Sequence, residues 1–142
     1  MVLDADNRAL IQTIWPCIAS HAEAYGSEAL LRMFLSFPQT KTYFPDFEVS
    51  KDSPQMKAHG KKVVDALTNA VHHLDNIDAA MSKLSDLHAY DLRVDPGNFP
   101  LLAHHLLVTI AVHHPDKLDC LTHRALDKFL DLIGCALTSK YR

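Results

Sequence analysis

Apolar residues recur every three or four positions along almost the whole chain, and this spacing limits the possible folds more than any other feature. The first stripe is Leu10, Ile11, Ile14, Trp15 and Ile18, and similar stripes follow within residues 25–37, 56–74, 81–88, 99–113 and 121–137. Such spacing places apolar side chains on one face of an α-helix. Four glycines and seven prolines leave few breaks. The sequence predicts an all-α protein with about seven or eight helices and no strand.

Capping signals predict where three of these helices begin. Asp4 is the expected N-cap of the first helix. The pairs Ser53-Pro54 and Asp95-Pro96 each combine a capping residue with a proline at the first helical position. We expect a helix to begin at each of these three places.

Other polar residues and prolines predict breaks. Pro115 should end the long helix before it, and residues 76–78 should separate two helices. Residues 37–54 predict a short helix followed by an irregular corner rich in aromatic side chains. Pro16 lies inside the first stripe, where it should remove a hydrogen bond and kink or shorten the helix.

Length and charge bound the function classes. A chain of 142 residues predicts a single domain over 1–142. The net charge of −3 and the scattered lysines and arginines argue against a nucleic-acid partner. Three cysteines without a CxxC pair argue for a reducing interior and against a structural zinc site. No signal peptide or membrane span is expected, since the apolar stretch 101–112 is short and interrupted. We therefore expect a cytoplasmic protein.

Two histidines stand in the middle of apolar stripes. His59 lies one turn before Val63, and His88 lies one turn after Leu84. A buried imidazole needs polar partners, and taken singly each is an ordinary core histidine. Together they could meet the two sides of a flat cofactor, because a neutral imidazole is a common axial ligand of haem iron. The spacing alone leaves a haem site and a packed core both open.

Five runs carry a resemblance to a known family. They are Lys41-Thr42-Tyr43-Phe44-Pro45, His59-Gly60-Lys61-Lys62, Leu84-Ser85-Asp86-Leu87-His88, Leu92-Arg93-Val94-Asp95-Pro96 and Leu137-Thr138-Ser139-Lys140-Tyr141-Arg142. At this spacing, and over the full length, the chain resembles vertebrate haemoglobin α-type chains of the globin family. Gln39 and the run Leu87-His88-Ala89-Tyr90 resemble the α-D branch.

The resemblance implies the globin fold around one haem b (iron protoporphyrin IX). His88 would be the proximal iron ligand, and His59 the distal residue that hydrogen-bonds bound oxygen. Lys62 would lie near a propionate. The other cofactor-binding residues implied are Tyr43, Phe44, Val63, Leu84, Leu87, Leu92, Val94, Asn98, Phe99, Leu102 and Leu137.

The resemblance also implies reversible binding of oxygen, and of CO and NO, in an erythrocyte heterotetramer with β-type chains. The tight pairing surface would contain Arg32, Phe37, His104, His123 and Asp127. The sliding contact that repacks between affinity states would contain Thr42, Tyr43, Pro45, Arg93, Asp95, Pro96, Asn98, Tyr141 and Arg142; subunit rotation of this kind is a known haemoglobin property.

Several positions depart from the family pattern. Asp46 replaces a histidine that reaches toward a propionate, and a carboxylate there would repel that group. Gln39 and Gly97 replace a threonine and a valine at the sliding contact. Tyr90 replaces a histidine, and Pro16 has no counterpart. The adjacent histidines His72-His73, His104-His105 and His113-His114 are predicted to be surface groups, because neighbours on a helix point in different directions.

Two other functions remain to be weighed against oxygen carriage, which is not enzymatic. The first is a haem protein with peroxidase, nitrite-reductase or electron-transfer activity. Peroxidases polarise peroxide with a charged distal group such as arginine, and only Lys57, Lys61 and Lys62 lie near His59 in the sequence. The second is a helical interaction module without a cofactor, in which both histidines are merely buried.

Overall fold

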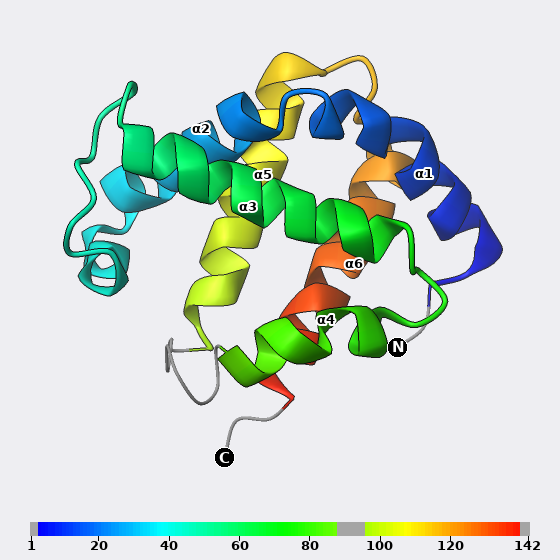
Figure 1. The fold of residues 1–142 in the computed structure, drawn as a ribbon. Helices are drawn as coiled ribbons and strands as arrows, with labels where there is room; N and C mark the ends of the chain where they lie inside the picture. Colours follow the sequence, from blue (N-terminus) through cyan, green and yellow to red (C-terminus); the bar gives the residue numbers. More distant parts are fainter. Residues whose placement is uncertain (1–2, 88–95, 140–142) are drawn as a thin grey trace.

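The computed structural model describes residues 3–87 and 96–139, and within these ranges it contains helices and no strand. The elements in chain order are α1 (Ala5–Ala19), α2 (Ala22–Ser36), the 3₁₀-helix η1 (Pro38–Tyr43), α3 (Pro54–Val71), α4 (Ile77–Asp86), α5 (Asn98–His113) and α6 (Cys120–Thr138). The prediction of an all-α protein is confirmed. Figure 1 shows α3 running across the front of the molecule, with α4 below it and α6 passing behind its right-hand end.

Polar side chains cap four of the described helices at their N-termini, and three of these caps are Asp4, Ser53 and Asp119. Asp4 accepts a hydrogen bond from the backbone N–H of Asn7 at 2.8 Å and so begins α1, as predicted. The Ser53 hydroxyl caps α3 in the same way, and Pro54 occupies the first helical position. Asp119 caps α6. Local capping chemistry therefore sets these three helix starts, as it also does that of α4.

Two predicted boundaries differ from the structure. α4 already begins at Ile77, because the Asn76 side chain caps it by accepting from the Ala79 N–H. α5 begins at Asn98 after Gly97, and not at Asp95-Pro96. The Phe99 N–H donates to the Pro96 carbonyl at 3.3 Å, which makes Pro96 part of a turn before the helix. Asp95 lies outside the described residues.

Pro16 does not end α1, and the predicted shortening is wrong. The helix continues to Ala19, and the Pro16 carbonyl accepts a hydrogen bond from the Ser20 N–H at 3.1 Å. A proline removes only its own N–H donor and crowds the preceding turn. Because Pro16 lies in the last turn and its side chain is exposed, α1 loses one hydrogen bond close to its natural end.

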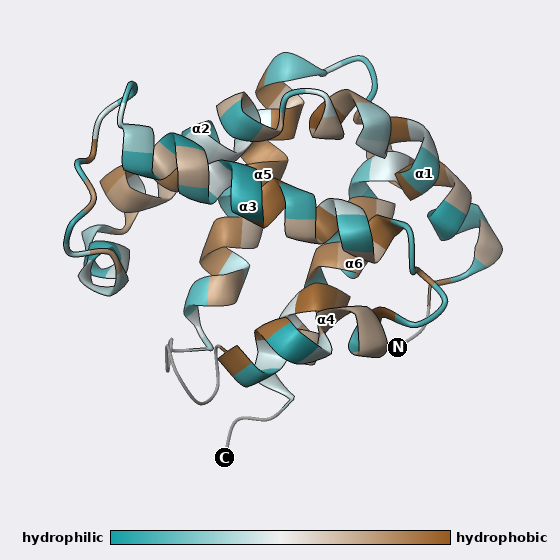
Figure 2. Ribbon diagram, in the orientation of Figure 1, coloured by the Kyte–Doolittle hydropathy of each residue, from teal (hydrophilic) through white to brown (hydrophobic). Residues whose placement is uncertain are grey.

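The buried side chains form two clusters. The larger joins α1, α2, α3, α4, α5 and α6, and it includes Trp15 against Phe129, with ring centroids 5.8 Å apart. The smaller consists of Leu30, Met33, Phe34 and Met56 from α2 and α3. Leu102 of α5 packs against both clusters. Hydrophobic positions lie on the inner sides of the helices in Figure 2.

Helices α2 and α3 approach most closely at two glycines. A Cβ on Gly26 would overlap the backbone of Gly60, and a Cβ on Gly60 would overlap the backbone of Ser27 and Gly26. Glycine is therefore required at this crossing, since only it allows backbone to meet backbone. The crossing places the residue before Gly60, which is His59, beside the smaller cluster. None of the described helices has the length and apolar character needed to cross a bilayer.

Candidate cofactor site

His59 lies half-buried on α3 beside an aromatic corner. Its ring meets the edge of Phe44 with centroids 5.0 Å apart at 65°, and that of Phe47 with centroids 5.8 Å apart at 72°. Aromatic pairs at these distances prefer such tilted or edge contacts. The two phenyl rings therefore limit the orientations open to the imidazole.

Backbone and side-chain hydrogen bonds hold this corner in place. The buried Thr40 hydroxyl donates to the Phe37 carbonyl at 2.7 Å, which stabilises η1. The Lys41 ammonium donates to the Phe44 carbonyl at 2.8 Å. Phe44 then packs against Phe34 of the smaller cluster, with ring centroids 5.4 Å apart. The corner is thus anchored to the core.

Four helices contribute apolar side chains that are only half-buried. Val63 of α3, Leu84 of α4, Leu102 of α5 and Leu137 of α6 each pack on the larger cluster and keep part of their surface accessible. Leu87, just after α4, is 39% exposed. Burying apolar surface stabilises a complex, so such side chains fit an apolar ligand. All five were predicted from the family resemblance.

The other predicted pocket residues differ in how exposed they are, and three of them lie outside the described residues. Tyr43 at the end of η1 is 38% exposed, and Lys62 on α3 is exposed. Asn98 and Phe99 are half-buried in the first turn of α5. His88, Leu92 and Val94 lie outside the described residues, as do Tyr90, Arg93, Asp95, Tyr141 and Arg142. The predicted proximal ligand is therefore untested by the structure.

The described residues fit an iron porphyrin. A porphyrin is flat and largely apolar, and its iron takes axial imidazole ligands. Val63, Leu84 and Leu102 offer apolar surface on three helices, and His59 supplies an imidazole at the same apolar face of α3 as Val63, four residues on. Lys62 is the nearby cation suited to a propionate.

Phe47 belongs to the aromatic corner predicted within residues 37–54, where the sequence leaves two interpretations open: an apolar lid over a cofactor, or packing in the core or at the edge of a pocket. In the structure its ring touches both Phe44 and His59. Phe47 lies in an irregular segment after η1. Helical periodicity therefore could not predict which side chains its ring contacts.

The predicted tight pairing surface lies on the outer side of α2, α5 and α6. Arg32 and Phe37 are half-buried, and His104, His123 and Asp127 are exposed. The same three helices also carry the most exposed large apolar side chains described, which are Leu35 at 67%, Leu121 at 56% and Val112 at 54%. The sequence analysis did not identify these three, because stripes of apolar residues were assigned to the core.

The prediction that the paired histidines all lie at the surface is wrong in part. His105 is 5% exposed, its Nδ1 is 2.6 Å from the Leu101 carbonyl, and its ring meets the edge of Phe37. His114 is half-buried. Their neighbours His104 and His113 are exposed, so adjacent histidines do point in different directions.

Comparison with known proteins places these features in a family. The globin family model matches residues 27–137. Haemoglobin subunit alpha-2 of Telmatobius peruvianus is 67% identical over 137 residues, which cover 96% of this chain and all of the relative. Haemoglobin subunit alpha-C of Aquarana catesbeiana is 62% identical, and haemoglobin subunit alpha of Xenopus tropicalis 61%, each over the full length of both chains. The chain therefore belongs to the globin family and groups with the haemoglobin α subunits.

Proposed function

We propose that this chain transports oxygen as the α-type subunit of a haemoglobin, by reversible binding at a ferrous haem. Its full-length identity of 61–67% to haemoglobin α subunits is the observation that carries the proposal. The position of His59 among Phe44, Phe47 and the half-buried apolar side chains supports it.

The bound cofactor, haem b, would supply a ferrous iron that takes up the gas reversibly. The chain's own residues do the rest. His88 would hold the cofactor through its imidazole, and His59 would offer a hydrogen-bond donor to the oxygen molecule. Phe44 and Phe47 would keep the His59 ring oriented. Val63 and Leu102 would exclude water from the site, which would slow oxidation of a ferrous iron held there.

The assembly we propose is a heterotetramer with β-type chains in the cytoplasm of the erythrocyte, in which this chain forms one domain over 1–142. Arg32, Phe37 and the exposed apolar side chains of α2, α5 and α6 would form the tight contact. Apolar area of this kind on one face is typical of a partner surface.

Enzymatic turnover is not favoured. The relatives are named haemoglobins. Near His59, the Lys61 ammonium lies 2.6 Å from Asp65 on the exposed side of α3, so it is directed away from the apolar side chains. The sequence around His59 also contains no arginine, the charged distal group with which peroxidases polarise peroxide.

Absorbance spectra test the proposal directly. The reduced protein should give a five-coordinate deoxy spectrum that changes with oxygen, changes differently with CO, and reverts under vacuum. His88→Gly should lose the haem or hold it loosely, and added imidazole should restore binding. A ferrous bis-histidine spectrum, or a His88→Gly variant with unchanged colour and oxygen affinity, would contradict oxygen carriage.

A further inference from the structure

Lys41 of η1 is a half-buried cation, and among the described residues it forms no ion pair with an acidic side chain. Its ammonium donates instead to the Phe44 carbonyl at 2.8 Å and to the Pro45 carbonyl at 3.3 Å. Both carbonyls lie just beyond the end of η1, where a helix leaves its last carbonyls without internal partners. A lysine near a helix C-terminus can bind such carbonyls, and the helix dipole favours its charge there. Lys41 therefore caps the C-terminal end of η1.

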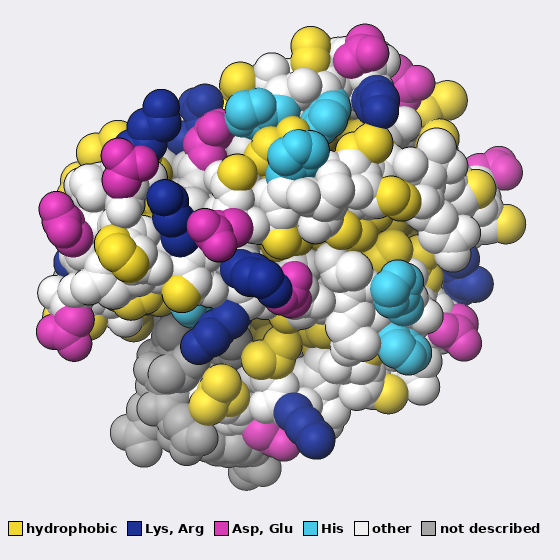
Figure 3. Space-filling view, turned by 45° about the horizontal axis from the view of Figure 1, so that its top comes forward, with side chains coloured by type: hydrophobic (Ala, Val, Ile, Leu, Met, Phe, Trp, Pro, Cys, Tyr) yellow, Lys and Arg dark blue, Asp and Glu magenta, His cyan; other side chains and the backbone are white. Residues whose placement is uncertain are grey.

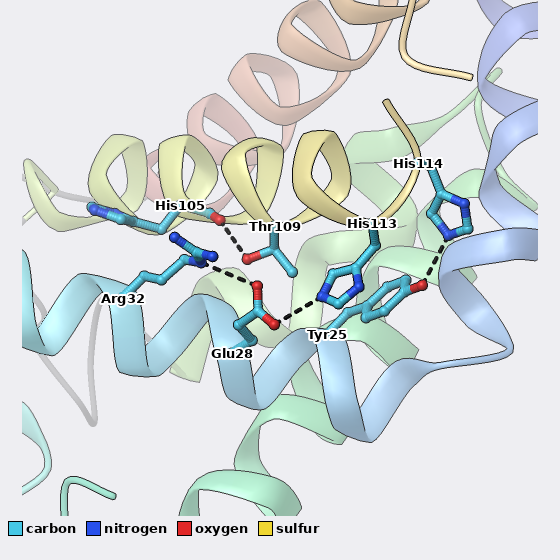
Figure 4. A network of polar contacts seen from close by, with 7 residues as sticks. All are labelled: Tyr25, Glu28, Arg32, His105, Thr109, His113 and His114. Carbon is cyan, nitrogen blue, oxygen red and sulfur yellow. Dashed lines mark hydrogen bonds and ion pairs between the residues drawn. The ribbon is translucent and has the colours of Figure 1, made fainter. Parts of the chain in front are cut away.

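Other basic side chains of the described part of the chain pair with acidic groups. Figure 4 shows the Glu28 carboxylate, which lies 3.1 Å from Arg32 Nε within α2 and 2.8 Å from His113 Nε2 of α5. Lys61 pairs with a carboxylate within α3. On the face drawn in Figure 3, basic side chains in dark blue lie among acidic ones in magenta. Because Lys41 binds backbone carbonyls instead, its side chain fixes the course of the chain at this corner.

Hydrogen bonds hold Phe44 at both its N–H and its carbonyl. The N–H donates to the Lys41 carbonyl at 2.9 Å, and the carbonyl accepts from the Phe47 N–H at 3.1 Å as well as from the Lys41 ammonium. The backbone of Phe44, with φ −136° and ψ 59°, has left the helical region, so the helix itself no longer fixes this residue. The bonds with Lys41 therefore set the position from which the Phe44 side chain starts.

The Phe44 ring connects this position to His59. It packs on Phe34 of the smaller cluster, with centroids 5.4 Å apart, and meets the His59 imidazole at 5.0 Å. Phe47, whose N–H is bonded to the Phe44 carbonyl, meets the same imidazole at 5.8 Å. A functional side chain keeps one orientation only when the residues packed on it are themselves held. The Lys41 ammonium thus reaches His59 through a single intervening residue, Phe44.

We propose that Lys41 is a positioning residue for His59. Its ammonium fixes Phe44 at the end of η1, and the Phe44 ring holds the imidazole toward the bound ligand. The inference rests on the proposed oxygen binding, in which His59 offers a hydrogen bond to the ligand. Loss of the ammonium leaves the Pro45 carbonyl to water and the Phe44 carbonyl with a single donor. The corner then moves more freely, and His59 is turned away from the ligand for a larger share of the time.

Lys41→Met tests the proposal in the full-length, CO-bound chain, because it removes the ammonium and keeps an apolar stem. Infrared spectroscopy measures the C–O stretching frequency, which falls when a hydrogen-bond donor lies beside the CO oxygen. The wild type should show a main band at low frequency, and His59→Leu should shift that band upward. In Lys41→Met the fraction of the upshifted band should rise about tenfold, which corresponds to about 1.4 kcal/mol. A hydrogen bond from a charged group is worth at least this much.

Hydrogen exchange of the corner gives a second measurement that does not depend on the ligand's spectrum. The Phe44 and Phe47 N–H groups donate within the segment that the Lys41 ammonium holds. A peptide covering 38–47 should therefore exchange about tenfold faster in Lys41→Met than in the wild type, which again corresponds to about 1.4 kcal/mol. The peptide covering 11–18 in α1, far from the corner in sequence, should exchange at the wild-type rate.

Lys57→Met is the matched control. Lys57 is also half-buried, and it lies two residues before His59 on α3, so its side chain points to a different side of the helix. Its ammonium lies 4.0 Å from the Asp52 carboxylate and bonds to neither carbonyl of the corner. The variant removes the same charge near His59 and leaves the hydrogen bonds of Lys41 in place. Its infrared bands and its exchange over 38–47 should match the wild type.

The outcomes separate this inference from the proposed function. Wild-type bands in Lys41→Met would overturn the role of Lys41 and leave oxygen binding intact, even if the corner exchanged faster, because that would be a merely structural effect. An equal shift of the bands in Lys57→Met would overturn it as well, since the lost charge alone would then be the cause. An unshifted band in His59→Leu would mean that His59 does not contact the ligand, and would remove this inference with that role. A wild-type chain that binds neither haem nor CO would overturn the proposed function itself.

Discussion

The crossing of α2 and α3 depends on two single residues without side chains. Gly26 and Gly60 meet backbone to backbone, and neither has space for a Cβ. The smaller buried cluster, which joins these two helices, depends on this close approach. A side chain at either glycine should therefore destabilise the packing of α2 on α3 as a whole, and not only the contact at the glycine itself.

Gly26→Ala is the variant that tests this point at the residue scale. The new methyl group must push α3 away, and overpacking of this kind costs about 1–3 kcal/mol or more. Denaturant unfolding of the CO-bound chain measures the loss. Gly134→Ala is the control, because a Cβ there meets only Phe99 at 3.9 Å. It should be neutral or stabilising by up to about 1 kcal/mol, from helix propensity. Equal effects of the two variants would contradict the packing argument.

A residue's place in the site could be predicted from the sequence where helical spacing alone determines which face the residue lies on. His59 and Val63 lie four residues apart on α3, so periodicity alone assigns them to one face. Phe47 could not be assigned to His59 in this way, because hydrogen bonds of the corner, such as Lys41 to the Phe44 carbonyl, set its position. The need for glycine at Gly26 arises only from a crossing between helices distant in sequence.

At the scale of elements, the predictions succeeded where the determinant is local. Asp4 and Ser53 cap α1 and α3 through bonds that span three residues. The start of α5 was predicted too early, because the turn around Pro96 resembles a cap in sequence. The junction of α2 with α5 was not predicted at all, since Glu28 and His113 meet only after both helices have packed.

A single hydrogen bond between elements gives a second prediction. Buried Trp15 of α1 donates from Nε1 to the Thr68 hydroxyl of α3 at 2.9 Å. Thr68→Val keeps the shape and leaves the indole N–H without its acceptor, which should cost about 1–3 kcal/mol. Thermal and denaturant unfolding followed by circular dichroism measures the loss.

Thr13→Val is the control for that variant, because the exposed Thr13 hydroxyl donates only to the Ala9 carbonyl of its own helix. It should change the free energy of unfolding by no more than about 0.5 kcal/mol, as surface substitutions usually do. If both threonine variants lose the same free energy of unfolding, the hydrogen bond between Trp15 and Thr68 adds nothing to stability, because water replaces it equally well.

At the scale of the whole molecule, some helices are stabilised by protein side chains alone, whereas others should depend on the proposed cofactor. Trp15, Ile18 and Phe129 are almost completely buried by protein alone. Leu84 and Leu87, at the end of α4, remain partly or well exposed. The energetic cost of removing a cofactor should therefore be concentrated in α4 and the start of α5, and be small around α1.

Hydrogen exchange of the haem-free and CO-bound chains, measured by mass spectrometry, tests this distribution. A ligand that binds only the native state protects the segments it buries, and about 1.4 kcal/mol corresponds to a tenfold change in exchange. On haem removal, peptides covering 77–87 and 98–102 should exchange at least about tenfold faster, while those covering 11–18 should change far less. The contrast follows because protein side chains already bury Ile11, Ile14 and Ile18, whereas Leu84 and Leu102 keep surface that only another group could cover. Uniform loosening of all helices would mean that the cofactor stabilises one cooperative unit, and that the half-buried side chains do not mark its place.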